Sequence, residues 1–180
     1  MITARTELIN ALSAYKSDYA EELQFRQSFL ELLKSERCYQ RDHLPGHLTG
    51  SAFIIDETKT FTLLTHHAKL NKWLQPGGHA DGDENISNVA LREAKEETGL
   101  ENFNLHSHGI FDIDIHTIPE RKEFPEHLHY DVRILLYASR EENYVISEES
   151  NDLAWVSLTD VNPITKNESL FRMVKKALSL

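Results

Sequence analysis

The sequence predicts an α/β (α+β) fold in which a mixed β-sheet is flanked by α-helices and preceded by an extra helical segment. Three observations predict this fold class. Apolar residues recur at helical spacing between residues 3 and 35, β-rich runs begin near residue 51, and two later segments alternate apolar with polar residues. A chain of 180 residues can bury one sizeable core, so we expect one main domain with an appendage.

The first 45 residues are expected to form the helical extension. Their apolar periodicity is interrupted near Asp18, which predicts two helices, and Asp18 with Glu21 resembles a capping box at the start of the second one. The segment DHLPGHLTG contains a proline and two glycines that end the helical pattern. We therefore place the boundary of the main domain at residue 46, so that this domain spans residues 46 to 180.

The main domain is expected to alternate strands with two helices. Asn85 is suited to cap the first of these helices and Gly99 to end it in a left-handed conformation. The predicted strands are 51–56, 60–67, 107–117, 127–139 and 153–158, and the predicted helices are 85–98 and 167–178.

Charge and composition exclude several classes of function. The net charge of -10 argues against an extended nucleic-acid surface, because phosphate contacts need clustered lysine and arginine. The single cysteine, Cys38, cannot form an internal disulfide, which suits a reducing compartment. No apolar stretch is long enough to predict a leader or a membrane span. We therefore expect a cytoplasmic protein that does not engage a membrane.

The predicted helix 85–98 carries a cluster of carboxylates close to its end. Glu93, Glu96 and Glu97 fall within an arc of roughly 100° on this helix, although like charges at this spacing repel. The apolar residues Ile86 and Val89 lie on nearly the same face, which turns the acidic cluster toward the protein. Carboxylates held there need cations. Oxygen ligands of this kind suit hard ions, so the sequence predicts a site for Mg²⁺ or Mn²⁺.

The spacing from Gly78 to Leu100 resembles the Nudix box of the MutT-like hydrolases at every fixed position of that motif. The resemblance implies the Nudix fold, a mixed sheet sandwiched between helices, over residues 46–180. It implies metal binding and catalysis by Glu93, Glu96 and Glu97, with the main-chain carbonyl of Gly77 as a further metal ligand. It also implies a structural ion pair between Glu84 and Arg92.

The implied activity is hydrolysis of a diphosphate linkage in a small phosphorylated molecule of the nucleoside diphosphate-X type, by attack of water at phosphorus. The sequence does not identify the leaving group or the general base. Candidates for the base are box glutamates, Glu93 or Glu96, and carboxylates on later loops, namely Glu120, Glu123, Glu126, Glu148 and Glu149.

A second polar face is predicted on the strands 107–117 and 127–139. If they form a hairpin with His116 opposite His127, their polar side chains gather on one face of the sheet. This face either lines the substrate cleft, where its histidines and arginine contact the substrate or hold another metal ion such as zinc, or is an ordinary solvent-facing surface. The candidate substrate-binding residues are Lys72, His116, His127, His129 and Arg133.

Two alternatives to a hydrolase are open from the sequence. One is a catalytically silent Nudix module that senses a nucleotide, and the other is an enzyme like isopentenyl-diphosphate isomerase, which would need a catalytic cysteine near the region before the box. The only cysteine, Cys38, lies in the extension, and the box is intact. Both facts favour hydrolysis. The N-terminal helices are expected to pack on the main domain or to form a homodimer contact.

Overall fold

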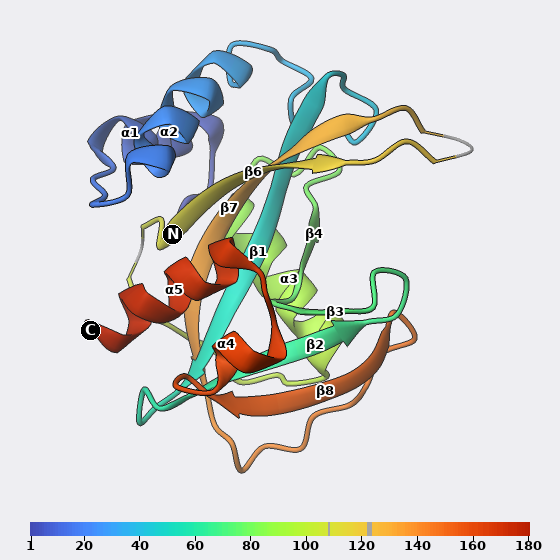
Figure 1. Cartoon of the computed structure of the whole chain (residues 1–180). Helices are drawn as coiled ribbons and strands as arrows, with labels where there is room; N and C mark the ends of the chain where they lie inside the picture. Colours follow the sequence, from blue (N-terminus) through green and yellow to red (C-terminus); the bar gives the residue numbers. More distant parts are fainter. Residues whose placement is uncertain (108, 122–123) are drawn as a thin grey trace.

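The computed structural model of the chain describes residues 1–107, 109–121 and 124–180, and its strands form one curved mixed sheet (Figure 1). β1 and β7 run in parallel through the centre, with Gly46 opposite Leu128 and Asp56 opposite Ala138. The strands are β1 (Gly46–Asp56), β2 (Phe61–His67), β3 (Lys72–Leu74), β4 (Gly77–His79), β5 (Asn104–Leu105), β6 (Asp112–Ile118), β7 (His127–Ala138) and β8 (Ser150–Ser157).

Two strands share one edge of β1 and diverge from each other there. β4 pairs with the first half of this edge, where Gly77 lies opposite Ser51, whereas β2 pairs with the second half, where Leu63 lies opposite Ile54. Between the two pairings, the amide of Ala52 donates a hydrogen bond of 2.9 Å to the carbonyl of Pro76. The sheet is therefore forked at the middle of β1.

Helices cover both faces of this sheet, as the sequence predicts. α3 (Ile86–Thr98) packs against β1 on one face, where the Val89 side chain comes so near to Gly50 that an added Cβ would lie 3.0 Å from it. The other face is covered by α4 (Val161–Ile164) and α5 (Glu168–Leu178), whose apolar residues form a core with Phe53 and Ile55 of β1. Because side chains alternate along a strand, β1 serves both cores.

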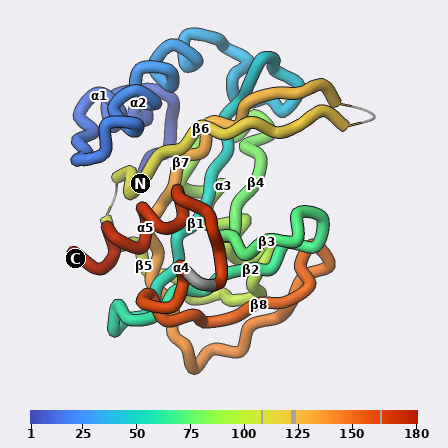
Figure 2. The backbone as a smooth tube through the Cα atoms, viewed as in Figure 1, coloured from blue at the N-terminus to red at the C-terminus, as the bar shows by residue number. Residues whose placement is uncertain are grey.

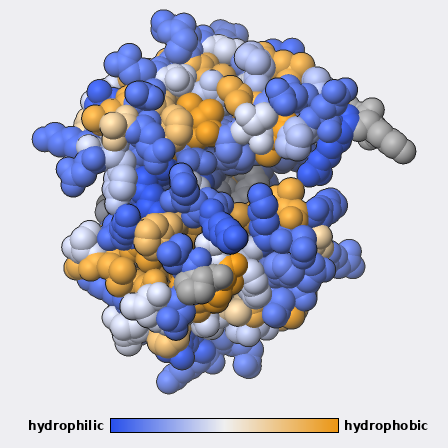
Figure 3. Space-filling model, viewed as in Figure 1, coloured by the Kyte–Doolittle hydropathy of each residue, from blue (hydrophilic) through white to orange (hydrophobic). Residues whose placement is uncertain are grey.

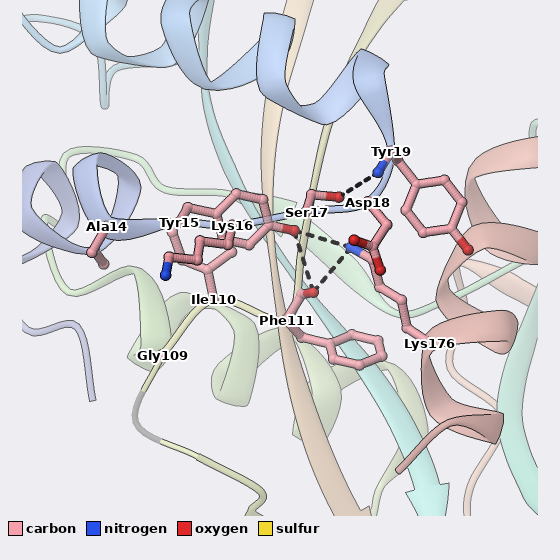
Figure 4. A pocket seen from close by; sticks show the side chains of 11 residues that line it. Ala14, Tyr15, Lys16, Ser17, Asp18, Tyr19, Gly109, Ile110, Phe111 and Lys176 are labelled. Carbon is pink, nitrogen blue, oxygen red and sulfur yellow. Dashed lines mark hydrogen bonds between the residues drawn. The ribbon is translucent and has the colours of Figure 1, made fainter.

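The N-terminal helices, α1 (Arg5–Ala14) and α2 (Ala20–Leu32), lie beside β6 and join the α3 core (Figure 2). The carboxylate of Glu22 accepts a hydrogen bond of 3.2 Å from the amide of Ile113 in β6. Near the start of β6, the Tyr15 hydroxyl and the Lys176 amine meet at the carbonyl of Phe111 (Figure 4). The extension therefore satisfies backbone groups along an edge strand.

The boundaries of β2, β7, α3 and α5 agree with the sequence prediction to within one residue, whereas β3, β4, β5 and α4 were not predicted. Asn85 caps α3 with its side chain and Gly99 ends it at φ 69°, as predicted. The capping box at Asp18 is wrong, because Tyr19 is the N-cap of α2 and makes no side-chain cap bond. β1 begins five residues earlier than predicted, since pairing with β7 extends it to Gly46, where an added Cβ would lie 2.7 Å from the Leu128 carbonyl oxygen.

The predicted hairpin forms, but its register differs by two residues. His116 lies opposite His129, and Asp114 lies opposite Asp131. A shift of two keeps every side chain on its predicted face, because side chains alternate with period two. Of the region predicted as one strand over 107–117, only residues from Asp112 onward belong to a strand, β6, because β5 ends before this region at Leu105, and residue 108 lies outside the described residues.

None of the helices in the described ranges combines the length and the apolar character that crossing a bilayer would require.

Candidate active site

α3 brings two glutamates to the fork of the sheet. Its N-terminal half is anchored by Ile86 and Val89, which are fully buried against β1. Glu93 and Glu97 follow one turn apart on the same side of the helix, where they reach β4 and β2. The packing of the apolar residues therefore decides where the acidic ones lie.

Glu97 lies at the point where β4 and β2 diverge. Its carboxylate accepts a hydrogen bond of 2.7 Å from the amide of Gly77 and one of 3.4 Å from the Thr65 hydroxyl. Burial, followed by the negative charges of Glu93 and Glu149, raises the pKa of Glu97 to about 7, although the Gly77 bond acts in the opposite direction. A carboxylate in this position is stabilised in its charged form by a cation.

Glu93 fills the space beside Gly78. An added Cβ at Gly78 would lie 2.5 Å from the Oε2 atom of Glu93, so only glycine lets the carboxylate come this close to β4. Burial raises the pKa of Glu93, whereas the neighbouring Arg92, which donates a 2.7 Å hydrogen bond to Oε1, lowers it. Two partly buried carboxylates beside a glycine backbone fit the oxygen-rich ligand set of Mg²⁺ or Mn²⁺.

Glu96 and Glu149 lie at the rim of this site. Glu96 is exposed, and its charge contributes to the raised pKa of Glu93. Glu149 precedes β8 and is also exposed, and its charge raises the pKa of both Glu93 and Glu97. Of the loop carboxylates considered as the base, Glu149 is therefore one whose negative charge acts on both box glutamates. Glu123 lies outside the described residues.

The expected ion pair between Glu84 and Arg92 is replaced by other contacts. The guanidinium of Arg5 in α1 forms the ion pair with Glu84, and its Nε atom lies 3.0 Å from Oε1. Arg92 instead donates to the His79 carbonyl at 2.9 Å and to Glu93. The box spacing gave no sign of this exchange, because the competing cation comes from the extension, which is remote in sequence.

The polar face of the hairpin divides into two parts, and the part nearer α5 is an ion network. Arg133, predicted to bind substrate, is only 2% exposed. Its guanidinium contacts Asp131 at 2.9 Å and Asp112 at 3.0 Å, and also bonds to the Ser169 hydroxyl of α5. The donors of Arg133 are therefore occupied by buried protein groups, which argues against the predicted contact with substrate.

Asp112 is the centre of that network. Arg172 donates to both of its carboxylate oxygens, at 2.9 and 2.8 Å, and Lys176 approaches at 2.8 Å. Although burial alone would raise it, these cations hold the pKa of Asp112 well below its usual range. The network joins β6 and β7 to α5, and through Glu22 it joins both to α2.

The part farther from α5 is a cluster of histidines, which we call the histidine cluster and which comprises His47, His79, His116, His127 and His129. Their ring centroids lie between 4.9 and 5.5 Å apart in six pairs. Burial, followed by contact with other histidines, lowers the pKa of His129, and burial lowers that of His47 to about 4. In Figure 3, hydrophilic residues border the hollow between the hairpin and α5.

Of the predicted substrate residues, the structure therefore brings His116, His127 and His129 together and leaves Lys72 apart, exposed on β3. The sequence prediction missed His47 and His79 as members of the cluster. His47 belongs to the alternating run GHLTGS, so a strand beginning at residue 46 would have identified its face. His79 follows the box glycines and gave no comparable signal.

The chain is similar to known proteins over most of its length. The NUDIX domain family matches residues 45–177. A probable DHNTP pyrophosphohydrolase of Lactococcus lactis subsp. cremoris is 33% identical over 117 residues, covering 63% of this chain and 68% of the relative. An asymmetrical bis(5'-nucleosyl)-tetraphosphatase of Rattus norvegicus is 29% identical over 119 residues, covering 63% of this chain and 74% of the relative.

Solved structures share the fold. A C. elegans Ap4A hydrolase in a binary complex superposes with a TM-score of 0.59 at 19% identity, covering 73% of this chain and 95% of that one. A NUDIX-family hydrolase from Clostridium perfringens gives a TM-score of 0.55 at 28% identity, again over 73% and 95%. With the family match spanning most of the sequence and the box glutamates gathered at the fork, the chain belongs to the Nudix family of hydrolases.

Proposed function

We propose that this protein hydrolyses a diphosphate linkage in a small nucleotide-type substrate with the help of Mg²⁺ or Mn²⁺. The observation that carries the proposal is the placement of Glu93 and Glu97 against the glycine backbone of β4. Carboxylates at the fork would hold the ion together with the Gly77 carbonyl, and Glu96 at the rim is the third proposed ligand. When bound, such an ion supplies charge neutralisation for the phosphate oxygens and activates water.

The residues around the fork have separate parts in this proposal. The Gly77 amide and Thr65 hold the Glu97 carboxylate in one orientation, and Arg92 does so for Glu93. For the base that takes a proton from the attacking water, we favour Glu149, because its exposed carboxylate interacts electrostatically with both box glutamates. Glu93 and Glu96 remain the candidate bases within the box.

The relatives narrow the class of substrate. A pyrophosphohydrolase and a nucleosyl-tetraphosphatase both act on phosphate anhydrides, and one of the similar solved structures is an Ap4A hydrolase. We infer that this chain likewise acts on a small molecule with several linked phosphates rather than on long RNA. Its net charge of -10 agrees with this, since it provides no broad basic surface for a polyanion. The cytoplasmic location and a homodimer contact stay predictions.

The isomerase alternative is disfavoured by the position of Cys38. This thiol lies in the extension, where it is fully buried and where the carbonyl of the same residue accepts a hydrogen bond from Leu48 of β1, and burial raises the pKa of the thiol. The silent-sensor alternative is disfavoured by the intact pair of glutamates. A sensor would bind the same nucleotide without cleaving it, which an activity assay distinguishes.

The test is Mg²⁺-dependent product release from a panel of nucleoside di- and triphosphates, dinucleoside polyphosphates and nucleotide sugars. We expect one class to be hydrolysed, and Glu97→Gln to abolish the reaction. Glu101→Gln is the matched control, because Glu101 is an exposed glutamate just beyond the helix, paired with Lys95. Oxygen-18 from labelled water should appear in only one product, which identifies the phosphorus attacked. Nucleotide binding without hydrolysis across the panel would favour the sensor.

A further inference from the structure

Three members of the histidine cluster converge with their side-chain nitrogens. One ring nitrogen from each of His47, His127 and His129 lies within 4.8 Å of the corresponding nitrogens of the other two. The residues come from the adjacent strands β1 and β7, where His47 is opposite His129 in the parallel register. Their approach is therefore fixed by the central pair of strands and not by flexible loops.

Two of the three rings carry a polar atom without a partner. His47 is fully buried, and its Nε2 atom has no hydrogen-bond partner among the described residues; the same is true of the buried Nε2 of His129. A buried nitrogen left unsatisfied costs roughly 1–3 kcal/mol, so such atoms usually face a ligand or an ordered water.

The third ring is oriented as metal-binding histidines commonly are. The Nδ1 atom of His127 lies 2.8 Å from the carbonyl oxygen of Pro125. The Nδ1 atom of His47 makes a weaker contact of the same kind, 3.4 Å from the carbonyl oxygen of His43. A carbonyl accepts a hydrogen bond, so Nδ1 carries the proton and Nε2 keeps its lone pair. The carbonyls of Pro125 and His43 thus favour the tautomer that a metal ion requires.

We propose that His47, His127 and His129 form a binding site for a divalent transition-metal ion of the zinc class, with a fourth position left open. Four donors around Zn²⁺ at about 2.0–2.1 Å stand about 3.3 Å apart, so the three nitrogens need to draw together only modestly. Imidazole nitrogens suit Zn²⁺ and its neighbours in the transition series, whereas Mg²⁺ takes oxygen ligands. This site is therefore chemically distinct from the glutamates at the fork.

An anion is a poorer occupant for the same nitrogens. Binding phosphate would require protonated rings, but positive charges about 5 Å apart in a partly buried site repel one another strongly. Neutral rings with free lone pairs instead match a cation.

The test is a calorimetric titration of the metal-free chain with Zn²⁺ in excess Mg²⁺, which keeps the glutamates occupied. We expect one equivalent of Zn²⁺ to bind. His47→Gln and His129→Gln should each weaken Zn²⁺ binding by at least about 100-fold, because losing only a contact that supports a ligand costs up to about 100-fold. His106→Gln is the matched control, because His106 is exposed and bonded to Tyr137. Glu97→Gln should bind Zn²⁺ normally, which separates this inference from the proposed hydrolysis.

X-ray absorption at the zinc edge of the unmutated protein provides a second measurement that does not depend on how the variants fold. We expect a shell with three imidazole nitrogens at about 2.0–2.1 Å. The proposal is overturned if no Zn²⁺ binds, if the shell is made of oxygens, or if binding is lost in Glu97→Gln and kept in the histidine variants. Binding of inorganic phosphate in place of Zn²⁺, abolished by His129→Gln, would also overturn it.

Discussion

Replacing Gly78 by alanine should damage catalysis far more than folding. The added Cβ would lie 2.5 Å from Glu93 Oε2, and ordinary contact begins at 3.4 Å, so the carboxylate must withdraw by the difference of about 0.9 Å. The atom displaced is the end of a side chain, which can move without shifting the backbone. A misplacement of about 1 Å in a catalytic site costs about 100-fold in rate, and we expect kcat/KM to fall by that factor in Gly78→Ala.

Two other glycines provide the comparison for this variant. An added Cβ at Gly77 would lie 2.9 Å from the Cα of Ser51, which is backbone, so Gly77→Ala should lower the urea midpoint as well as the rate. At Gly109 the nearest atom is 4.0 Å away, so Gly109→Ala should change neither. The measurements are kcat/KM at saturating Mg²⁺ and urea unfolding. If Gly78→Ala hydrolyses substrate as fast as Gly109→Ala, the placement of Glu93 does not govern the reaction.

Three further outcomes test other parts of the structure. Arg172→Met should lower the free energy of urea unfolding by about 3–5 kcal/mol, because it leaves buried carboxylates without this cation. Arg37→Met, which removes an exposed salt bridge to Asp42, should lower it by less than about 1 kcal/mol. Mg²⁺ at 100 times its Kd should stabilise the protein by about 2.7 kcal/mol in thermal unfolding, and Glu97→Gln should abolish that shift. Arg5→Ala removes hydrogen bonds to Glu84 and to two backbone carbonyls, so it should lower the free energy of unfolding by about 1–2 kcal/mol. No measurable loss would show that these bonds do not stabilise the packing of α1.

The parts of the fold that could be predicted from the sequence are those specified by local pattern. The helix from Asn85 to Gly99 was predicted because its cap, its apolar face and its left-handed end all lie within one short segment. The start of β1 was missed because Pro45 and Gly46 resemble a turn when read locally. Only the pairing with β7, about 80 residues away in sequence, makes Gly46 a strand residue.

The candidate active site could likewise be predicted only where a local sequence pattern specifies it. The box spacing predicted that Glu93 and Glu97 share a face, and the structure places both at the fork. It did not predict that Glu84 would pair with Arg5 instead of Arg92, because long-range contacts choose among several equally suitable partners. Whether the three box glutamates bind metal, and whether His127 and its neighbours contact substrate, stays a prediction for the assays above.

The division of the hairpin's polar face follows from what covers each part. Arg172 on α5 packs over the part that contains Asp112 and Arg133, so charges there are fully paired and the pKa of Asp112 is held low. Without comparable cations from α5, the same alternation of polar residues would leave buried charges unpaired, which costs several kcal/mol each. The part beyond α5 instead carries histidines, which can be buried as neutral rings. Side chains such as His47 and His129 therefore keep nitrogens without a hydrogen-bond partner among the described residues, whereas a salt-bridge network would have bound them.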